Sequence, residues 1–387
     1  MLPKIKLFFV NAAALLLLAF STNTKAAQKA SLAAATDSSL NKEYITNIMH
    51  RVADWQLNAW NTGGFKHPKV DWTNAACYTG IYALGSMPGN DKYIDALVKI
   101  GEDLNWNTGK NRFFADDYCV GQTYSLLYTR FKDKKMIAPF ILLADSIVAQ
   151  PHTESLEWKN KINLREWAWC DALFMGPTAL AYLSTATGDP KYLQTATKLW
   201  WQTTDYLYDP AEKLYFRDGS YLNKKEKNGE KVFWSRGNGW VLAGLVRVLE
   251  NMPKNYPDKK KFEQLYKDMA GRIASLQQPD GSWHASLLDP ASYPIKETSG
   301  TGFYTYAILW GMNHGLLKEK TYWPVVKKAW AALTVSVHPN GMLGYVQRIG
   351  AAPDGVTAES TEVYGVGAFL LTGTQLHEYL SKHPKAK

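Results

Sequence analysis

The amino-acid sequence predicts an all-α fold in which six helical hairpins close into an (α/α)6 barrel. Three observations lead to this prediction. Helical segments recur in pairs with a period of about sixty residues. The first segment of each pair is apolar and contains a central glycine, as an inner helix packed on all sides requires. The second segment has one apolar stripe with lysines opposite, as an outer helix requires.

The expected pairs follow one another along the chain. They are residues 71–87 with 91–104, 117–131 with 134–149, 171–187 with 190–207, 239–252 with 262–276, and 301–316 with 322–335. Residues 40–60 and 363–380 supply the remaining outer and inner helices. The central glycines are Gly80, Gly121, Gly176, Gly244, Gly311 and Gly367. An open solenoid such as a tetratricopeptide array is the alternative, but its repeat is only about 34 residues long.

Residues 1–27 have the features of a secretory signal peptide. Lys4 and Lys6 precede an apolar run at residues 7–20, and small residues follow around Ala26. That run is shorter than the roughly 20 residues of a membrane-spanning helix, and no cysteine follows it for lipidation. We therefore expect export across the inner membrane to the periplasm, no stable membrane anchor, and one barrel domain over residues 28–387; the oligomeric state stays open.

Composition narrows the class of ligand. The formal charge is +9, but the lysines are dispersed and form no basic stripe, so we expect no nucleic-acid partner. The three cysteines, Cys77, Cys119 and Cys170, lie in apolar surroundings, which favours buried free thiols over disulfides. Fifteen Trp and 22 Tyr suit a protein that holds sugar rings, although many of them belong to the core.

The unusual residues fall in the loops that enter the expected inner helices. In a closed barrel these loops meet at one end. They contain Asp116 and Asp117, Asp171, the run 234–240, the run 280–284 and the run 297–300. Carboxylates for proton transfer, aromatic rings and an arginine for a substrate carboxylate make up a carbohydrate site. Asp171 is the leading catalytic candidate because its neighbours are apolar and aromatic, and a helix N-cap is the alternative for it.

Other chemistries lack their motifs. The sequence has no His-Glu-x-x-His, no Cys-x-x-Cys, no phosphate-binding glycine loop before a lysine, and no Gly-x-Ser-x-Gly. Asp116, Asp117 and Asp171 would be a poor set for a divalent cation, since such sites draw more oxygen ligands from one short loop. We expect neither a metal nor a cofactor.

Four blocks resemble a known family. They are Trp-Cys-Asp-Ala-Leu-Phe-Met at 169–175, Phe-Trp-Ser-Arg-Gly-Asn-Gly-Trp at 233–240, Trp-His at 283–284 and Glu-Thr-Ser-Gly at 297–300. Together they resemble the unsaturated rhamnogalacturonyl hydrolases, glycosidase family 105, over nearly the whole expected mature chain. The first and third blocks occur in looser form in the related unsaturated glucuronyl hydrolases.

The resemblance implies an (α/α)6 barrel that removes the 4,5-unsaturated uronic acid left at a non-reducing end by a polysaccharide lyase. It implies that Asp171 is the general acid/base and that Asp116 is the second carboxylate, with Asp117 as the alternative. The substrate is then an acidic oligosaccharide. The expected substrate-binding residues are Asp117, Trp72, Gln122, Trp169, Arg217, Trp234, Arg236, Trp240, Trp283 and His284.

One departure from the family concerns Arg217. Many members have Tyr-His-x-Trp-Asp where this chain has Tyr-Phe-Arg-Asp-Gly at 215–219, which makes Arg217 a candidate for binding a carboxylate or a sulfate. Arg236 is a candidate for the uronate, and the alternative is that it braces its loop against an Asp. Two other functions stay open: an ordinary inverting glycosidase, with its two carboxyl groups about 6.5–9.5 Å apart, and a glycan-binding protein without catalysis.

Overall fold

The computed structural model describes residues 39–151, 155–157 and 167–384. The expected signal peptide lies outside these residues. Within them the α-helices are α2 (Lys42–Gly63), α3 (Trp72–Gly85), α4 (Asp91–Asp103), α5 (Val120–Phe131), α6 (Ala138–Ala149), α7 (Ala172–Thr187), α8 (Pro190–Leu207), α9 (Ser235–Asn251), α10 (Lys259–Ser275), α11 (Thr298–Asn313), α12 (Glu319–Thr334) and α13 (Val363–Lys382).

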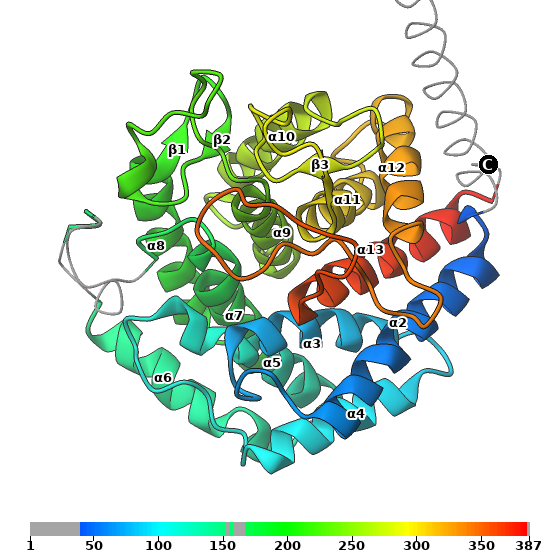
Figure 1. Cartoon of the computed structure of the whole chain (residues 1–387). Helices are drawn as coiled ribbons and strands as arrows, with labels where there is room; N and C mark the ends of the chain where they lie inside the picture. The colour runs from blue at the N-terminus through cyan, green and yellow to red at the C-terminus, as the bar shows by residue number, and fades with distance from the viewer. Residues whose placement is uncertain (1–38, 152–154, 158–166, 385–387) are drawn as a thin grey trace, which may run out of the picture.

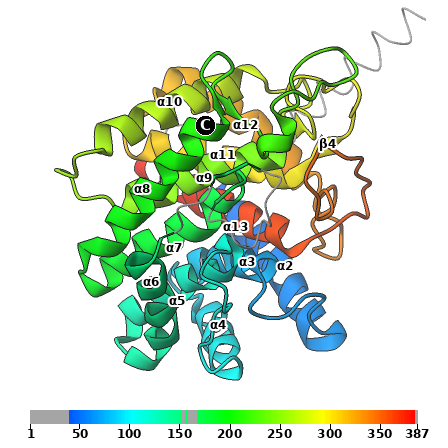
Figure 2. The ribbon, with the colours of Figure 1, turned by 90° about the vertical axis from the view of Figure 1, so that its left-hand side faces the viewer.

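Six of these helices form a closed inner ring. Helix α3 contacts α5, and contacts continue through α7, α9 and α11 to α13, which returns to α3. Figure 1 shows this ring around the centre, with α4, α6, α8, α10, α12 and α2 farther out. The view in Figure 2 is at right angles and shows the long loop between α12 and α13 at one end of the barrel. Each inner helix was expected at its place in the sequence.

Glycines let the inner helices approach closely. A Cβ atom on Gly80 of α3 would lie 2.3 Å from the carbonyl oxygen of Gly367 on α13. A Cβ atom on Gly244 of α9 would lie 2.6 Å from the carbonyl oxygen of Leu173 on α7. No side chain fits at such distances, so the small residues of the inner helices are a condition of ring closure.

Two inner helices begin earlier than the sequence pattern suggested. Helix α9 starts at Ser235 and not at Gly239, and α11 starts at Thr298 and not at Thr301. The carboxylate of Glu297 accepts hydrogen bonds from the backbone N–H groups of Ser299 and Gly300, which fixes the start of α11. The residues around Arg236 are therefore a first helical turn and not a loop.

Short elements complete the rim. The 3-10 helix η1 (Ala115–Tyr118) precedes α5, η2 (Lys134–Met136) precedes α6, and η4 (Gly219–Tyr221) follows the hairpin of β1 (Tyr208–Asp209) and β2 (Leu214–Tyr215). A second hairpin pairs β3 (Trp283–His284) antiparallel with β4 (Lys296–Glu297). The sequence pattern had not indicated either hairpin.

Aromatic rings fill the centre of the barrel. The ring of Trp240 lies 4.2 Å from that of Phe303 and 4.8 Å from that of Phe174, measured between centroids. These three residues come from three inner helices and are buried. The three cysteines are also buried and free, as predicted. No helix among the described residues is long and apolar enough to cross a bilayer.

Candidate active site

Asp171 lies directly before α7 with its side chain almost fully buried. Two contacts with a neighbouring loop hold the segment before it: the N–H of Cys170 donates to the carbonyl oxygen of Arg217 at 2.8 Å, and Trp169 pairs with Asp218 in an antiparallel bridge. The Asp171 carboxylate accepts no hydrogen bond from the first turn of α7. The N-cap alternative therefore does not explain this residue.

The surroundings of Asp171 perturb its acidity. Burial raises its pKa, while the positive charges of Arg217 and Arg236 and a hydrogen bond from the Cys170 thiol lower it. The raising effect is larger, so the carboxyl group holds its proton to a higher pH than an exposed aspartate. A general acid needs this property.

Asp116 is the carboxyl group that the structure brings together with Asp171. It lies in η1, at the entrance to α5. Burial raises its pKa well above the usual value, the charge of Asp171 raises it further, and the charges of Asp71 and Asp117 add to this effect, while Arg217 lowers it. Mutual repulsion of this kind separates the protonation states of two carboxyl groups and is typical of acid/base pairs.

Asp117 has a different role in the geometry. Its Oδ2 atom accepts a hydrogen bond from the backbone N–H of Asn111 at 2.7 Å. A Cβ atom on Gly109 would collide with the Asp117 carboxyl group, so this loop packs directly on the side chain. Asp117 therefore holds the loop before η1. Of the two adjacent acids, Asp116 is the one whose charge interacts with Asp171.

The charges of Arg217 and Arg236 both act on Asp171, but the two arginines have different partners. The Nη1 group of Arg217 donates to Oδ2 of Asp218 at 2.7 Å, and both side chains are largely buried. Arg236 donates to two backbone carbonyl oxygens, those of Gln347 at 2.6 Å and Arg348 at 2.8 Å. The bracing that we considered for Arg236 is thus present, with carbonyl groups of the α12–α13 loop in place of an Asp.

Comparison with known proteins identifies the group to which this arrangement belongs. A family model described as Glycosyl Hydrolase Family 88 matches residues 47–380. The chain belongs to this family. It is 38% identical over 357 residues to a protein of Formosa agariphila named unsaturated 3S-rhamnoglycuronyl hydrolase, an alignment that covers 87% of this chain and 91% of the relative. The chain is therefore a glycoside hydrolase, and the family resemblance stated from the four sequence blocks is confirmed.

Solved structures of family 88 type share the fold. A glycosyl hydrolase of family 88 from Bacteroides vulgatus is 32% identical and superposes with a TM-score of 0.78, covering 88% of this chain and all of the other (100%). A structure titled as a polysaccharide lyase is 33% identical with a TM-score of 0.79 and covers 88% and 98% of the two chains. Together with the closed helical ring, these similarities confirm the (α/α)6 barrel.

The tryptophans of the family 88 site differ in their exposure. Trp72, at the start of α3, is partly exposed and stacks on Tyr364 with 5.5 Å between ring centroids. The other four expected at the site, Trp169, Trp234, Trp240 and Trp283, are buried. Among these five, only Trp72 is partly exposed to solvent, and the other four are packed in the interior.

Gln122 lies deeper than the sequence suggested. It is fully buried on α5; its amide donates to the carbonyl oxygen of Phe174 at 2.9 Å and its oxygen accepts from Nε of Arg247 at 2.6 Å. With both ends satisfied and no exposed atom, the side chain ties α5 to α7 and α9. The reason for the difference is the direction of the side chain on its helix, toward α7 and α9, which spacing alone does not reveal.

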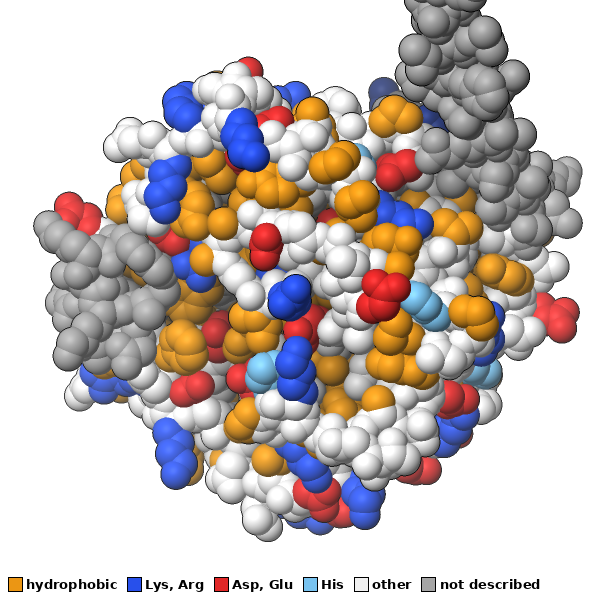
Figure 3. Space-filling model, viewed as in Figure 1, with side chains coloured by type: hydrophobic (Ala, Val, Ile, Leu, Met, Phe, Trp, Pro, Cys, Tyr) orange, Lys and Arg blue, Asp and Glu red, His pale blue; other side chains and the backbone are white. Residues whose placement is uncertain are grey.

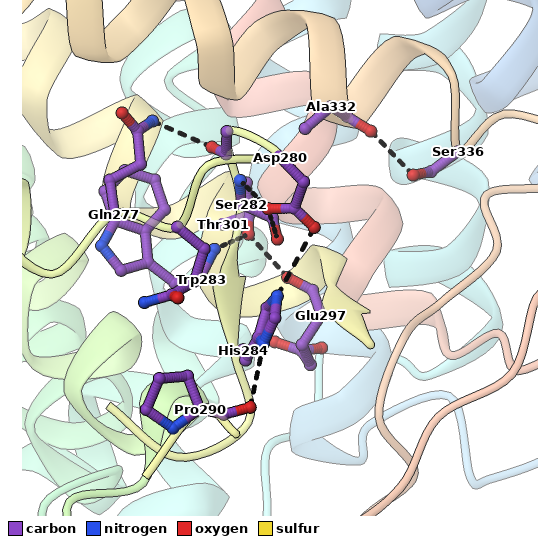
Figure 4. A network of polar contacts seen from close by, with 12 residues as sticks. Gln277, Asp280, Ser282, Trp283, His284, Pro290, Glu297, Thr301, Ala332 and Ser336 are labelled. Carbon is purple, nitrogen blue, oxygen red and sulfur yellow. Dashed lines mark hydrogen bonds and ion pairs between the residues drawn. The ribbon is translucent and has the colours of Figure 1, made fainter. Parts of the chain in front are cut away.

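The Trp283–His284 block supports the rim (Figure 4). Trp283 is fully buried and donates from its indole N–H to the carbonyl oxygen of Ile273 at 2.8 Å. His284 contacts Oδ2 of Asp280 at 3.4 Å and the carbonyl oxygen of Pro290 at 3.2 Å. Burial lowers the pKa of His284, but these hydrogen bonds more than offset it, so the net shift is upward. Both residues of the block thus hold the β3–β4 hairpin.

Sequence reasoning missed several residues of the site. Asp71 caps α3, and its charge acts on Asp116. Asp218 is buried and pairs with Arg217. Tyr221 lies near enough to Asp171 for that charge to affect its hydroxyl group. The position of Asp71 directly before an apolar helix is a recognisable N-cap pattern. Asp218 is followed by Gly219, and an Asp-Gly pair ordinarily indicates an exposed turn, so the sequence gives no sign that this carboxylate is buried.

A groove of about 950 Å³ between α2 and α4 lies apart from these carboxyl groups. Trp60, Phe65 and Lys69 are among its lining residues, and neither Asp116 nor Asp171 is. On the face of the molecule seen in Figure 3, acidic and basic side chains are interspersed among apolar ones, without a broad patch of one sign.

Proposed function

We propose that this enzyme removes 4,5-unsaturated uronic acid from the non-reducing end of lyase-generated acidic oligosaccharides. The observation that carries the proposal is the interacting pair of carboxyl groups, Asp171 and Asp116, with the arginine Arg217 beside them. The pair supplies a retained proton and a nearby negative charge. The Formosa agariphila relative, named for an unsaturated rhamnoglycuronyl substrate, supports the choice of reaction.

The reaction proposed is hydration of the vinyl ether at C4 and C5. The protonated carboxyl group of Asp171 gives its proton to C4, and positive charge builds at C5 and the ring oxygen. The carboxylate of Asp116 stabilises this charge. Asp171, now ionised, takes a proton from the water that adds to C5. The resulting hemiketal opens, and the bond to the next sugar breaks as its hemiacetal collapses.

The raised pKa values of the two carboxyl groups support a retained proton on the pair. Asp171 must be protonated at the start, and burial together with the nearby negative charges keeps a proton on the pair at a pH where a free aspartate has lost it. Proton transfers by a positioned group each accelerate a reaction by about 10²–10⁴-fold. Since one residue performs both transfers, the proposal assigns most of the catalysis to Asp171.

We propose a rhamnoglycuronyl-type substrate, in which the unsaturated uronate is linked to rhamnose. The name of the Formosa agariphila relative supports this, and so does the departure at residues 215–219, where Phe216 stands in place of the histidine that the resemblance predicts and Arg217 follows it. Arg217 at the border of Asp171 is the charged residue by which this site departs from the rhamnogalacturonyl pattern.

The first experiment is a screen of lyase-generated oligosaccharides from pectin, ulvan and glycosaminoglycans, followed by ultraviolet absorbance of the conjugated double bond. Hydration removes that absorbance, whereas a lyase acting on intact polysaccharide creates it, so the sign of the change separates the two. In heavy-oxygen water the label is expected at C5 of the released uronic acid. Label at an anomeric carbon, or turnover of saturated aryl glycosides, would show an ordinary glycosidase.

We also propose that the chain is exported to the periplasm as one barrel domain with its first 27 residues removed. The two lysines and the apolar run at residues 7–20 support this. N-terminal sequencing of protein from the periplasmic fraction is expected to begin near Gln28. An intact Met1 in that fraction would contradict the proposal.

A further inference from the structure

The loop after β2 runs along the segment that carries Asp171. The Arg217 carbonyl oxygen accepts from the N–H of Cys170, the residue before Asp171. One residue later, the Asp218 carboxylate accepts from the N–H of Ser220 at 2.8 Å and so begins η4. The last residue of η4, Tyr221, is half-buried and senses the charge of Asp171. Residues 217–221 therefore lie beside the segment that carries Asp171.

Arg217 is not available as a separate anion site within this border. Its guanidinium pairs with Asp218 at 2.7 Å, with 14% and 1% of the two side chains exposed. It also interacts with the charge of Asp171. With the buried Asp218 carboxylate paired to it, the guanidinium charge is already balanced. An anionic group on a second sugar would compete with a buried ion pair, which is costly to separate.

Lys224 differs from Arg217 in that it is exposed and has no acidic partner among the described residues. Its Nζ atom lies 3.9 Å from the centroid of the Tyr221 ring, and its one hydrogen bond among the described residues is a long one, 3.4 Å to Oγ of Ser220. No carboxylate of the described chain forms an ion pair with it, and the side chain is exposed. The aromatic face thus holds the ammonium group at the border of the site while leaving its charge without an acidic partner.

We propose that Lys224, held on Tyr221, recognises an anionic substituent, a sulfate or a carboxylate, on the sugar next to the unsaturated uronate. This inference rests on the proposed function and adds the residue that sets substrate charge preference. An ammonium group with three donors accepts either anion as a point charge. The neighbouring Lys225 is exposed on the same loop, and its ammonium group lies over none of the described aromatic rings, which makes it the matched control.

The test compares three disaccharides in which the sugar next to the unsaturated uronate is neutral, sulfated or carboxylated. For Lys224→Gln we expect KM to rise about fivefold or more for an anionic substrate at low ionic strength, with kcat unchanged, and less than twofold change for the neutral one. A rise with only one anion identifies which of the two is recognised. Lys225→Gln is expected to match wild type, and Lys224→Arg to retain most of the preference.

Equal losses on all three substrates, or equal losses in Lys224→Gln and Lys225→Gln, would overturn the inference. The inference is also overturned if the wild type removes the ultraviolet absorbance of the double bond and Lys224→Gln has an unchanged KM for every substrate. That result leaves the proposed function in place. A wild type without turnover refutes the function alone. In that event calorimetry of the anionic disaccharides with Asp171→Asn and with Asp171→Asn/Lys224→Gln still measures the lysine, and equal affinities would refute its role.

Discussion

The thiol of Cys170 donates a hydrogen bond to Oδ1 of Asp171 at 3.3 Å, and neither side chain has significant contact with solvent. A Cβ atom on Gly237 would lie 3.0 Å from the Cys170 sulfur and 3.3 Å from Oδ1, so the first turn of α9 closes this side. With Oδ1 occupied as an acceptor, Oδ2 is the oxygen left to carry the proton that moves to C4.

Removing this thiol is expected to change both rate and acidity. Cys170→Ala takes away a donor that stabilises the ionised form of Asp171, so its pKa rises and the basic limb of the kcat profile moves to higher pH. Loss of one hydrogen bond predicts a decrease in kcat of about 3- to 10-fold. Cys170→Ser restores a donor and is expected to recover most of the rate, while Cys77→Ala, at a buried thiol away from the site, leaves the profile unchanged.

Asp171→Asn is expected to lower kcat by several orders of magnitude while the fold and substrate affinity stay nearly intact, because both proton transfers disappear. The control is Asp117→Asn, since Asp117 holds a backbone N–H and its loss acts on the loop. The measurement is the rate of absorbance loss together with calorimetric binding. More than a tenth of wild-type activity in Asp171→Asn would exclude it as the acid/base.

We expect Asp116 to be needed for activity and to lower the stability of the folded protein at neutral pH. Its pKa is raised by burial and by the charge of Asp171, so its contribution to stability is complete below the usual value of 3.8 and is lost as the pH rises through the folded-state pKa. Asp116→Asn removes this loss. We expect an inactive variant whose Tm at neutral pH exceeds that of wild type by about 2 °C or more. The difference should shrink toward pH 3.8; a Tm below wild type at neutral pH would contradict this.

Arg236 is expected to act through the loop that it holds. Arg236→Lys removes the paired donors to the carbonyl groups of Gln347 and Arg348, although the Tyr364 hydroxyl still donates to the first. We expect a loss of about 0.5–1.5 kcal/mol of stability for each hydrogen bond removed. Urea unfolding should show this loss, and kcat/KM should fall by a similar factor on neutral and charged substrates. Arg51→Lys is the control, because Arg51 also donates to two carbonyl oxygens but is exposed. A change confined to uronate affinity would instead assign Arg236 to the substrate.

The ring of helices could be predicted from the sequence because inner helices need small residues and outer helices need one apolar stripe. The starts of α9 and α11 could not, since glycine-rich first turns resemble loops and only the Glu297 cap fixes one of them. Asp171 stood out because a carboxyl group among aromatic residues is rare. Its separation from an N-cap needed the structure, which shows the missing cap bond.

At the site, the sequence could not predict in which direction some side chains point. Gln122 lies on a predicted inner helix, but its side chain is buried and donates to Phe174. Trp283 lies on the unpredicted strand β3, and its indole N–H donates to Ile273 of α10. Lys224 was hidden for the opposite reason. It lies in a lysine-rich loop whose charges look like ordinary solvation, and only its position over the Tyr221 ring distinguishes it.

The contact of Gly80 on α3 with Gly367 on α13 joins segments that are synthesised far apart in time. Because α13 packs between α3 and α11, the ring cannot close before α13 has been made. At about 5–20 residues per second, the stretch from Gly80 to Gly367 takes roughly 15–60 s to make. Until α13 is made, the face of α3 that α13 covers has no partner, and the same holds for α11 once that helix has been made. The order of the helices in the chain therefore makes α13 the segment on which closure of the ring depends.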